Sequence, residues 1–183
     1  MNQIVAVVGM CGSGKSVITN YLEEKGWSRV YFGGVTIDEL HRRQLPVNES
    51  NEKAVREELR STYGPAAFAI LLKDRILNES KSHHTVLDGL YSWSEYTYLK
   101  ELLGDSLTIL AVVTNRKIRY DRLSSRPIRP LTHAGAEGRD YAEIENLAKG
   151  GPIAIADYYI TNNEDEDSLF RQLHAVLADI GIE

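Results

Sequence analysis

The chain has 183 residues, of which 43% are hydrophobic and 26% are charged, and these values are ordinary for one globular domain. The formal net charge of -5 argues against a protein that coats nucleic acid, and no apolar run approaches the ~20 residues that span a bilayer. Cys11 is the only cysteine and no secretory leader precedes the first strand-like run, so we expect a cytoplasmic protein without an intrachain disulfide.

Short β-branched runs alternate with longer helical patterns along the chain, which is typical of a parallel α/β sheet. The first predicted strand spans 4–8 and leads into a helix over about 14–25. A second strand is expected at 28–32, and helices that break near the prolines fill about 35–80.

The second half of the chain continues this alternation. A third strand covers 85–87, and the capping box of Ser92 and Glu95 opens a helix to about residue 103. The continuous apolar run 107–113 predicts a central strand that is buried on both faces. Thr114 is the expected cap of the next helix, which reaches about residue 125.

The segment 126–151 contains prolines and glycines and has a helical stretch near 141–149, so we expect a mobile excursion from the core. A fifth strand is expected at 158–161, and the acidic run 164–167 starts a last helix. The whole chain, 1–183, is therefore predicted to be a single α/β domain.

The strongest motif is G-x-x-x-x-G-K-S at 9–16, which leaves the first strand and enters the first helix. Its glycines let successive N–H groups converge on phosphate oxygens, and the helix dipole adds to that attraction. Lys15 supplies a charge for the β- and γ-phosphates, and the Ser16 hydroxyl is a magnesium ligand. For Cys11, a redox role and a purely steric role both stay open. The residues expected to bind ATP are Gly9, Cys11, Gly12, Ser13, Gly14, Lys15, Ser16 and Val17.

A carboxylate follows the third predicted strand, in the order Leu87-Asp88-Gly89. The carboxyl ends of parallel strands face the ligand crevice. Asp88 is therefore expected to hold Mg2+ through water or to orient an acceptor, although Asp-Gly also forms ordinary turns. Tyr91 and Trp93 follow closely enough to stack on a base.

Arginines cluster just before the excursion, in the pattern R-x-x-R-L-x-x-R. Their spacing of three and four predicts that Arg119, Arg122 and Arg126 share one stripe of a helix. An arginine beside a transferring phosphoryl group contributes about 10³–10⁵ in rate. We therefore expect Arg122 or Arg126 to touch phosphate, and both join Lys15 and Asp88 as candidate catalytic residues. A solvated basic face is the alternative for any one arginine.

These residues resemble the P-loop nucleoside monophosphate kinase superfamily. The likeness rests on the loop 9–16, the strand end Asp88-Gly89, the arginine pattern and the late segment Ala156-Asp157-Tyr158. Within the superfamily the chain is most similar to dephospho-CoA kinases and to adenylate-kinase-related proteins, and the stretch 57–67 also looks like the latter. The resemblance covers nearly the whole chain. It implies a three-layer P-loop NTPase fold with a five-stranded parallel sheet.

The resemblance also implies a helical acceptor-binding region at about 35–80 and a lid at about 126–151 that closes over ATP. The expected function is an ATP- and Mg2+-dependent kinase whose acceptor is a small metabolite such as a nucleotide, a nucleoside or dephospho-CoA. Dephospho-CoA kinases carry aspartates just after the second strand, but 31–34 holds none here and the nearest acid is Asp38. The alternative is therefore a nucleotide-binding switch with weak hydrolysis and no acceptor.

Overall fold

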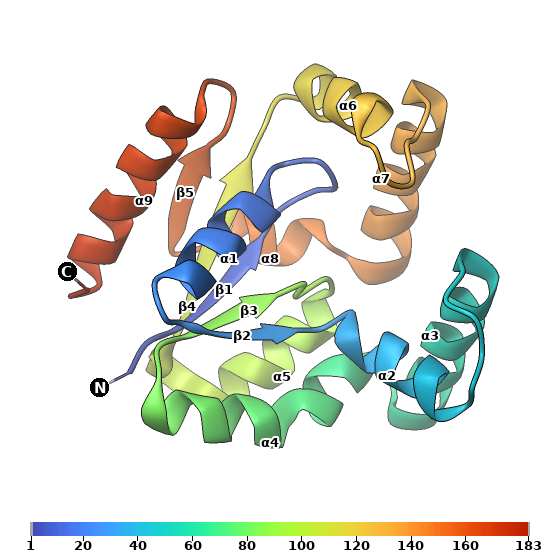
Figure 1. Cartoon of the computed structure of the whole chain (residues 1–183). Coiled ribbons are helices and arrows are strands. Elements are labelled where there is room, and N and C mark those ends of the chain that lie inside the picture. The colour runs from blue at the N-terminus through green and yellow to red at the C-terminus, as the bar shows by residue number, and fades with distance from the viewer. Residues whose placement is uncertain (1, 183) are drawn as a thin grey trace.

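The sheet stands at the centre of the molecule. The computed structural model describes residues 2–182, and its five parallel strands follow the order β2-β3-β1-β4-β5 (Figure 1). The strands are β1 (Ile4–Val8), β2 (Ser28–Tyr31), β3 (Thr85–Asp88), β4 (Leu107–Val113) and β5 (Tyr158–Thr161). Strand β1 lies between β3 and β4, so the chain connections from the two sides of β1 run in opposite directions across the sheet. Open α/β sheets bind ligands at the carboxyl end of the strands at such a switch point. The predicted five-stranded parallel sheet is confirmed.

Helices cover both faces of the sheet and extend beyond the carboxyl ends of its strands (Figure 1). The first face packs against α4 (Ala67–Ser82) and α5 (Trp93–Leu103), and the second packs against α1 (Lys15–Glu24) and α9 (Glu166–Asp179). The remaining helices are α2 (Gly34–Arg42), α3 (Glu49–Tyr63), the short 3-10 turn η1 (Gly104–Ser106), α6 (Arg116–Ser125), α7 (His133–Leu147) and α8 (Gly150–Ala154). Within residues 2–182, no helix has the length and apolar character needed to cross a membrane.

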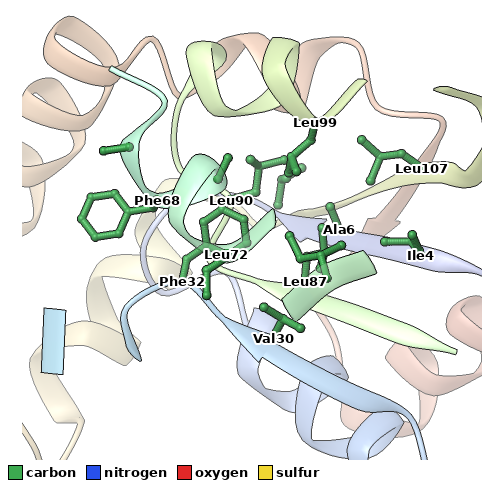
Figure 2. Close-up of a cluster of buried hydrophobic side chains, with 14 of the residues drawn as sticks. Ile4, Ala6, Val30, Phe32, Phe68, Leu72, Leu87, Leu90, Leu99 and Leu107 are labelled. Carbon is green, nitrogen blue, oxygen red and sulfur yellow. The ribbon is translucent and has the colours of Figure 1, made fainter. Parts of the chain in front are cut away.

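The core explains why the strands read as continuous apolar runs. Successive side chains of a strand point to opposite faces, so Ala6 and Val7 of β1 belong to two different hydrophobic clusters. Figure 2 shows the first cluster, in which Ala6 lies near Leu87 of β3. With apolar packing on both faces, the sheet holds the carboxyl ends of its strands in fixed relative positions.

Two local expectations are wrong in detail. The helix expected near 141–149 begins earlier, as α7, because the Thr132 side chain accepts a hydrogen bond from the Gly135 N–H and caps it. Thr114 does not cap α6, since Asn115 occupies the cap position without a side-chain bond. The Thr114 hydroxyl instead donates to the Ser13 carbonyl at 3.0 Å, which ties β4 to the loop after β1.

Candidate active site

The loop between β1 and α1 is held from outside through its carbonyl groups. The Ser13 carbonyl accepts the Thr114 hydroxyl and the Asn162 amide at 3.0 and 2.9 Å, and the Cys11 carbonyl accepts Arg119 at 2.9 Å. In a trans peptide the N–H points opposite to the C=O, so the following N–H groups face the inside of the loop. This arrangement suits binding of phosphate oxygens.

The packing of α6 against this loop depends on Gly12. Its φ is +79°, and a Cβ there would lie 2.9 Å from the Arg119 carbonyl oxygen and 2.9 Å from Leu123. Only glycine combines that backbone conformation with so close an approach. Gly12, which occupies a variable position of the motif, therefore lets the arginine helix pack against the phosphate loop.

Lys15 folds back over the loop. Its ammonium donates to the carbonyls of Gly9 and Met10 at 2.8 and 3.0 Å. Burial and, to a smaller extent, the nearby positive charge of Lys149 lower the pKa of Lys15 from 10.5 to about 8. A phosphate group would supply the negative charge that this buried cation lacks.

This shift predicts that nucleotide binding weakens in mild alkali. The Lys15 charge is complete at neutral pH and is lost above about pH 8, so we expect ATP affinity to fall by up to about tenfold per pH unit there. The same shift affects the stability of the fold. The pKa of Lys15 is lower in the folded protein than in the unfolded chain, so the buried charge lowers the free energy of unfolding below about pH 8. This loss of stability is relieved as the pH rises from about 8 toward 10.5. Titration of a fluorescent ATP analogue across this range measures the effect. A constant wild-type affinity would contradict it, and Lys15→Ala should bind weakly without this pH dependence.

A cleft of about 470 Å³ opens beside the loop, at the carboxyl ends of the strands. Seven of the predicted site residues meet there although they come from separate parts of the chain: Gly12, Gly14, Lys15, Ser16, Asp88, Arg122 and Arg126. The rest of the lining comes from Arg29, Tyr31, Tyr91 and Leu123. The cleft is rich in cationic groups, and Asp88 is the one carboxylate among the residues that line it.

Asp88 is paired with an arginine from the neighbouring strand. Arg29 of β2 donates from Nε and Nη2 to Asp88 Oδ2 at 3.1 and 2.5 Å. The side chain of Asp88 is only 10% exposed, and the Arg29 guanidinium lies against it as its counter-charge. Asp88 therefore lies in the cleft as predicted, and its partner Arg29 comes from a different strand.

The three arginines do not form the single stripe that their spacing predicts. Arg122 faces the cleft and donates to the Asn162 carbonyl at 3.1 Å, and Arg126 follows the end of α6 in extended conformation. Arg119 is buried instead, and donates to both carboxylate oxygens of Asp140 at 3.0 and 2.6 Å. The stripe breaks because α7 supplies a buried acid on one side of α6, and α6 itself ends before Arg126.

The other predicted residues lie around the cleft at varying distance. The glycines of the motif and Ser13 form the loop itself, and Cys11 packs against Tyr120 and Leu123. Val17 is partly buried against the second hydrophobic cluster and is not part of the cleft lining. Asp38 is exposed on α2 and does not line the cleft either, so it is not the missing acid after β2.

Residue patterns missed Arg29 and Tyr31, which line the cleft from β2. Neither belongs to a motif. The parallel register, which places Tyr31 beside Asp88, is the signal that finds them. A second omission is Lys149, which is 2% exposed and donates to Glu143 at 2.6 Å, with its ammonium 4.9 Å from the centre of the Tyr91 ring. Lys149 thus supports the wall of the cleft beside Lys15.

The donor groups in the cleft fit a magnesium ion that arrives with a nucleotide. In the part of the chain that the structure describes, no group of three or more His, Cys, Asp or Glu side chains is arranged to hold a metal. Ser16 and Asp88 supply one hydroxyl and one carboxylate, and Mg2+ commonly combines so few protein ligands with phosphate oxygens and waters. The site therefore suits a metal shared with a phosphate ligand.

Comparison with solved structures supports the same class of fold. The chain aligns over 98% of its length with TT1252 from Thermus thermophilus (98% of that chain, TM-score 0.67, 19% identity). It also aligns with a gluconokinase from Sinorhizobium meliloti (98% and 93% covered, TM-score 0.61, 15% identity) and with a shikimate kinase from Bacteroides thetaiotaomicron (98% and 99% covered, TM-score 0.61, 12% identity). Together with the loop 9–16, the fold defines a P-loop protein of the kinase-like type.

Residues 5–145 match the family model described as an AAA domain. The chain is 32% identical over 181 residues to a UPF0200 protein of Thermococcus kodakarensis, with 97% of each chain covered. It is 33% identical over 182 residues to a UPF0200 protein of Thermococcus gammatolerans, with 97% and 95% covered. This chain belongs to the UPF0200 family.

Proposed function

We propose that the protein is a cytoplasmic ATP- and Mg2+-dependent phosphotransferase whose acceptor is a small metabolite, such as a nucleotide, a nucleoside or dephospho-CoA. One observation carries this proposal. The phosphate loop, Asp88 and two arginines line a single cleft at the switch point of a P-loop sheet. The acidic net charge agrees with a small-molecule acceptor in place of nucleic acid.

Each cleft residue has a role in this chemistry. Lys15 leaves the Gly9 and Met10 carbonyls and binds the β- and γ-phosphates. Arg122 and Arg126 stabilise the charge that develops on the transferring phosphoryl group. Asp88 orients the acceptor or the water shell of the metal. Positioning and electrostatics then supply most of the rate, because little covalent chemistry is asked of the protein.

Magnesium, when bound, would neutralise phosphate charge, with Ser16 and Asp88 as its protein ligands, Asp88 through water. The protein contributes the fixed positions of these two groups. Ser16 lies in the first turn of α1, and Asp88 ends β3, so both belong to rigid elements of the central layer.

We further propose that residues 35–80 bind the acceptor and that residues 126–151 close over ATP. The ion pair between Arg129 of the second segment and Glu52 of the first supports this assignment, with Nη2 and Oε1 2.5 Å apart. A contact between the two segments would keep water out of the cleft during transfer. The kinase would then be protected from wasteful hydrolysis.

A nucleotide-binding switch without an acceptor is the second candidate, and one observation favours it. Asp88 is the one carboxylate of the cleft lining, and Arg29 already pairs with it. An acceptor hydroxyl would then find no carboxylate in the lining without a cationic partner to act as its general base. The two candidates differ in one measurable property, since only the kinase transfers phosphate to a metabolite.

The test is ADP release with ATP and Mg2+ in the presence of pools of nucleoside monophosphates, nucleosides and dephospho-CoA. We expect one pool to stimulate turnover, and we expect Lys15→Ala to abolish it because the phosphate loop loses its charge. Lys25→Ala is the matched control, since this lysine caps the far end of α1 and does not line the cleft. ATP binding without stimulation by any pool would favour the switch. Stimulated turnover that survives Lys15→Ala would contradict both candidates.

A further inference from the structure

Arg29 links the helix of the phosphate loop to the acid at the end of β3. Its Nη1 donates to Asn20 Oδ1 and Glu23 Oε2 of α1, at 2.8 and 3.2 Å. Its Nε and Nη2 donate to Asp88 Oδ2 at 3.1 and 2.5 Å. The side chain is 23% exposed, and its guanidinium plane is fixed from two opposite sides. Arg29 therefore connects α1 to the end of β3 through its guanidinium group, and we call this connection the Arg29 strut.

The strut distinguishes the two carboxylate oxygens of Asp88. Both hydrogen bonds from Arg29 end on Oδ2, whereas no hydrogen bond among the described residues ends on Oδ1. Because Asp88 lines the cleft, Oδ1 is the oxygen that is available to a ligand there.

We propose that Arg29 is a positioning residue that presets Asp88 Oδ1 for the hydrated magnesium of the bound nucleotide, an inference that rests on the proposed function. Asn20 and Glu23 lie on the same helix as Ser16, so the strut fixes where Asp88 stands relative to the other predicted metal ligand. The planar guanidinium carries several N–H donors, so it can bond to α1 and to Asp88 at the same time. A lysine at this position would keep the charge and lose the geometry.

The test is the gain in affinity that Mg2+ gives to a fluorescent, non-hydrolysable ATP analogue, measured as the ratio of the Kd in EDTA to the Kd in Mg2+. We expect Arg29→Met to lower this ratio by about tenfold, with the metal-free Kd changed far less. Asp88→Asn should lower it by a similar factor. The double variant should lose no more than either single change, because the arginine acts through the acid. Arg29→Lys should fall in between, and it serves in place of Arg29→Met if that variant does not fold.

Arg116→Met is the control, since Arg116 also pairs with a carboxylate, that of Glu137, and lies outside the cleft lining and outside residues 35–80 and 126–151. Its ratio should equal that of the wild type. The inference is overturned if the effects of Arg29→Met and Asp88→Asn multiply, if Arg29→Met raises the ratio, or if the wild type shows no gain from Mg2+. Because the assay needs no acceptor, a failed search for kinase activity leaves its result intact.

Discussion

Replacing Asp140 with asparagine is expected to destabilise the protein by about 3–5 kcal/mol, because the change leaves the Arg119 guanidinium buried without its counter-charge. The two side chains are only 7% and 6% exposed, so water cannot replace the lost partner. Asp140 also accepts the Tyr120 hydroxyl at 3.1 Å, which places three side chains in one buried network between α6 and α7. Urea unfolding of the two proteins measures the difference.

The same substitution is expected to weaken nucleotide binding, although Asp140 does not line the cleft. Arg119 joins Asp140 to the Cys11 carbonyl, so a shifted guanidinium disturbs the loop whose N–H groups must face the phosphates. Titration of a fluorescent ATP analogue under folding conditions separates this effect from the loss of stability. An affinity equal to that of the wild type would show that the loop keeps its shape without the ion pair.

Glu137→Gln is the matched control for this prediction. Glu137 forms an exposed ion pair with Arg116 across the same pair of helices, with 3.9 Å between Oε1 and Nη1. Exposed pairs contribute about 0–1 kcal/mol, so this variant should unfold close to the wild type. Equal stability of the Asp140 and Glu137 variants would mean that burial does not set the strength of the Arg119 pair.

The sheet could be predicted because its strands carry their own signal. The apolar run 107–113 indicates a strand buried on both faces, and β4 is formed there. The loop 9–16 could be predicted for a different reason, since each motif residue has a local backbone or charge requirement. Both signals lie within a few consecutive residues, and neither depends on a distant partner.

The partners of the site residues could not be predicted in this way. Arg119 and Arg122 belong to the same sequence pattern and look equivalent there. In the fold, Arg119 is buried in an ion pair with Asp140, which lies 21 residues later in the chain. Arg29 reaches Asp88 across 59 residues through the parallel pairing of two strands. Residue type and spacing therefore identify which groups carry charge, whereas the tertiary fold decides which of those charges remain available to a ligand.

Gly14→Ala is expected to abolish tight nucleotide binding, with a loss of affinity of about 100-fold or more, roughly 2.7 kcal/mol. Gly14 has a φ of +96°, and an added Cβ would lie 2.1 Å from Asn162 Nδ2. Asn162 cannot simply turn aside, because this amide nitrogen donates to the Ser13 carbonyl and its Oδ1 accepts from Arg122. Relief of the clash must therefore displace either the phosphate loop or an arginine of the cleft.

Gly26→Ala separates the clash from the backbone strain in this prediction. Gly26 has a similar φ of +88°, but no atom lies within 4 Å of its added Cβ. Both variants should lose about 1–3 kcal/mol of stability through the left-handed conformation, and only Gly14→Ala should lose the nucleotide. Urea unfolding and titration of the fluorescent ATP analogue on both variants test this pair. Wild-type affinity in Gly14→Ala would mean that the loop accommodates a side chain there, and that Asn162 does not fix its shape.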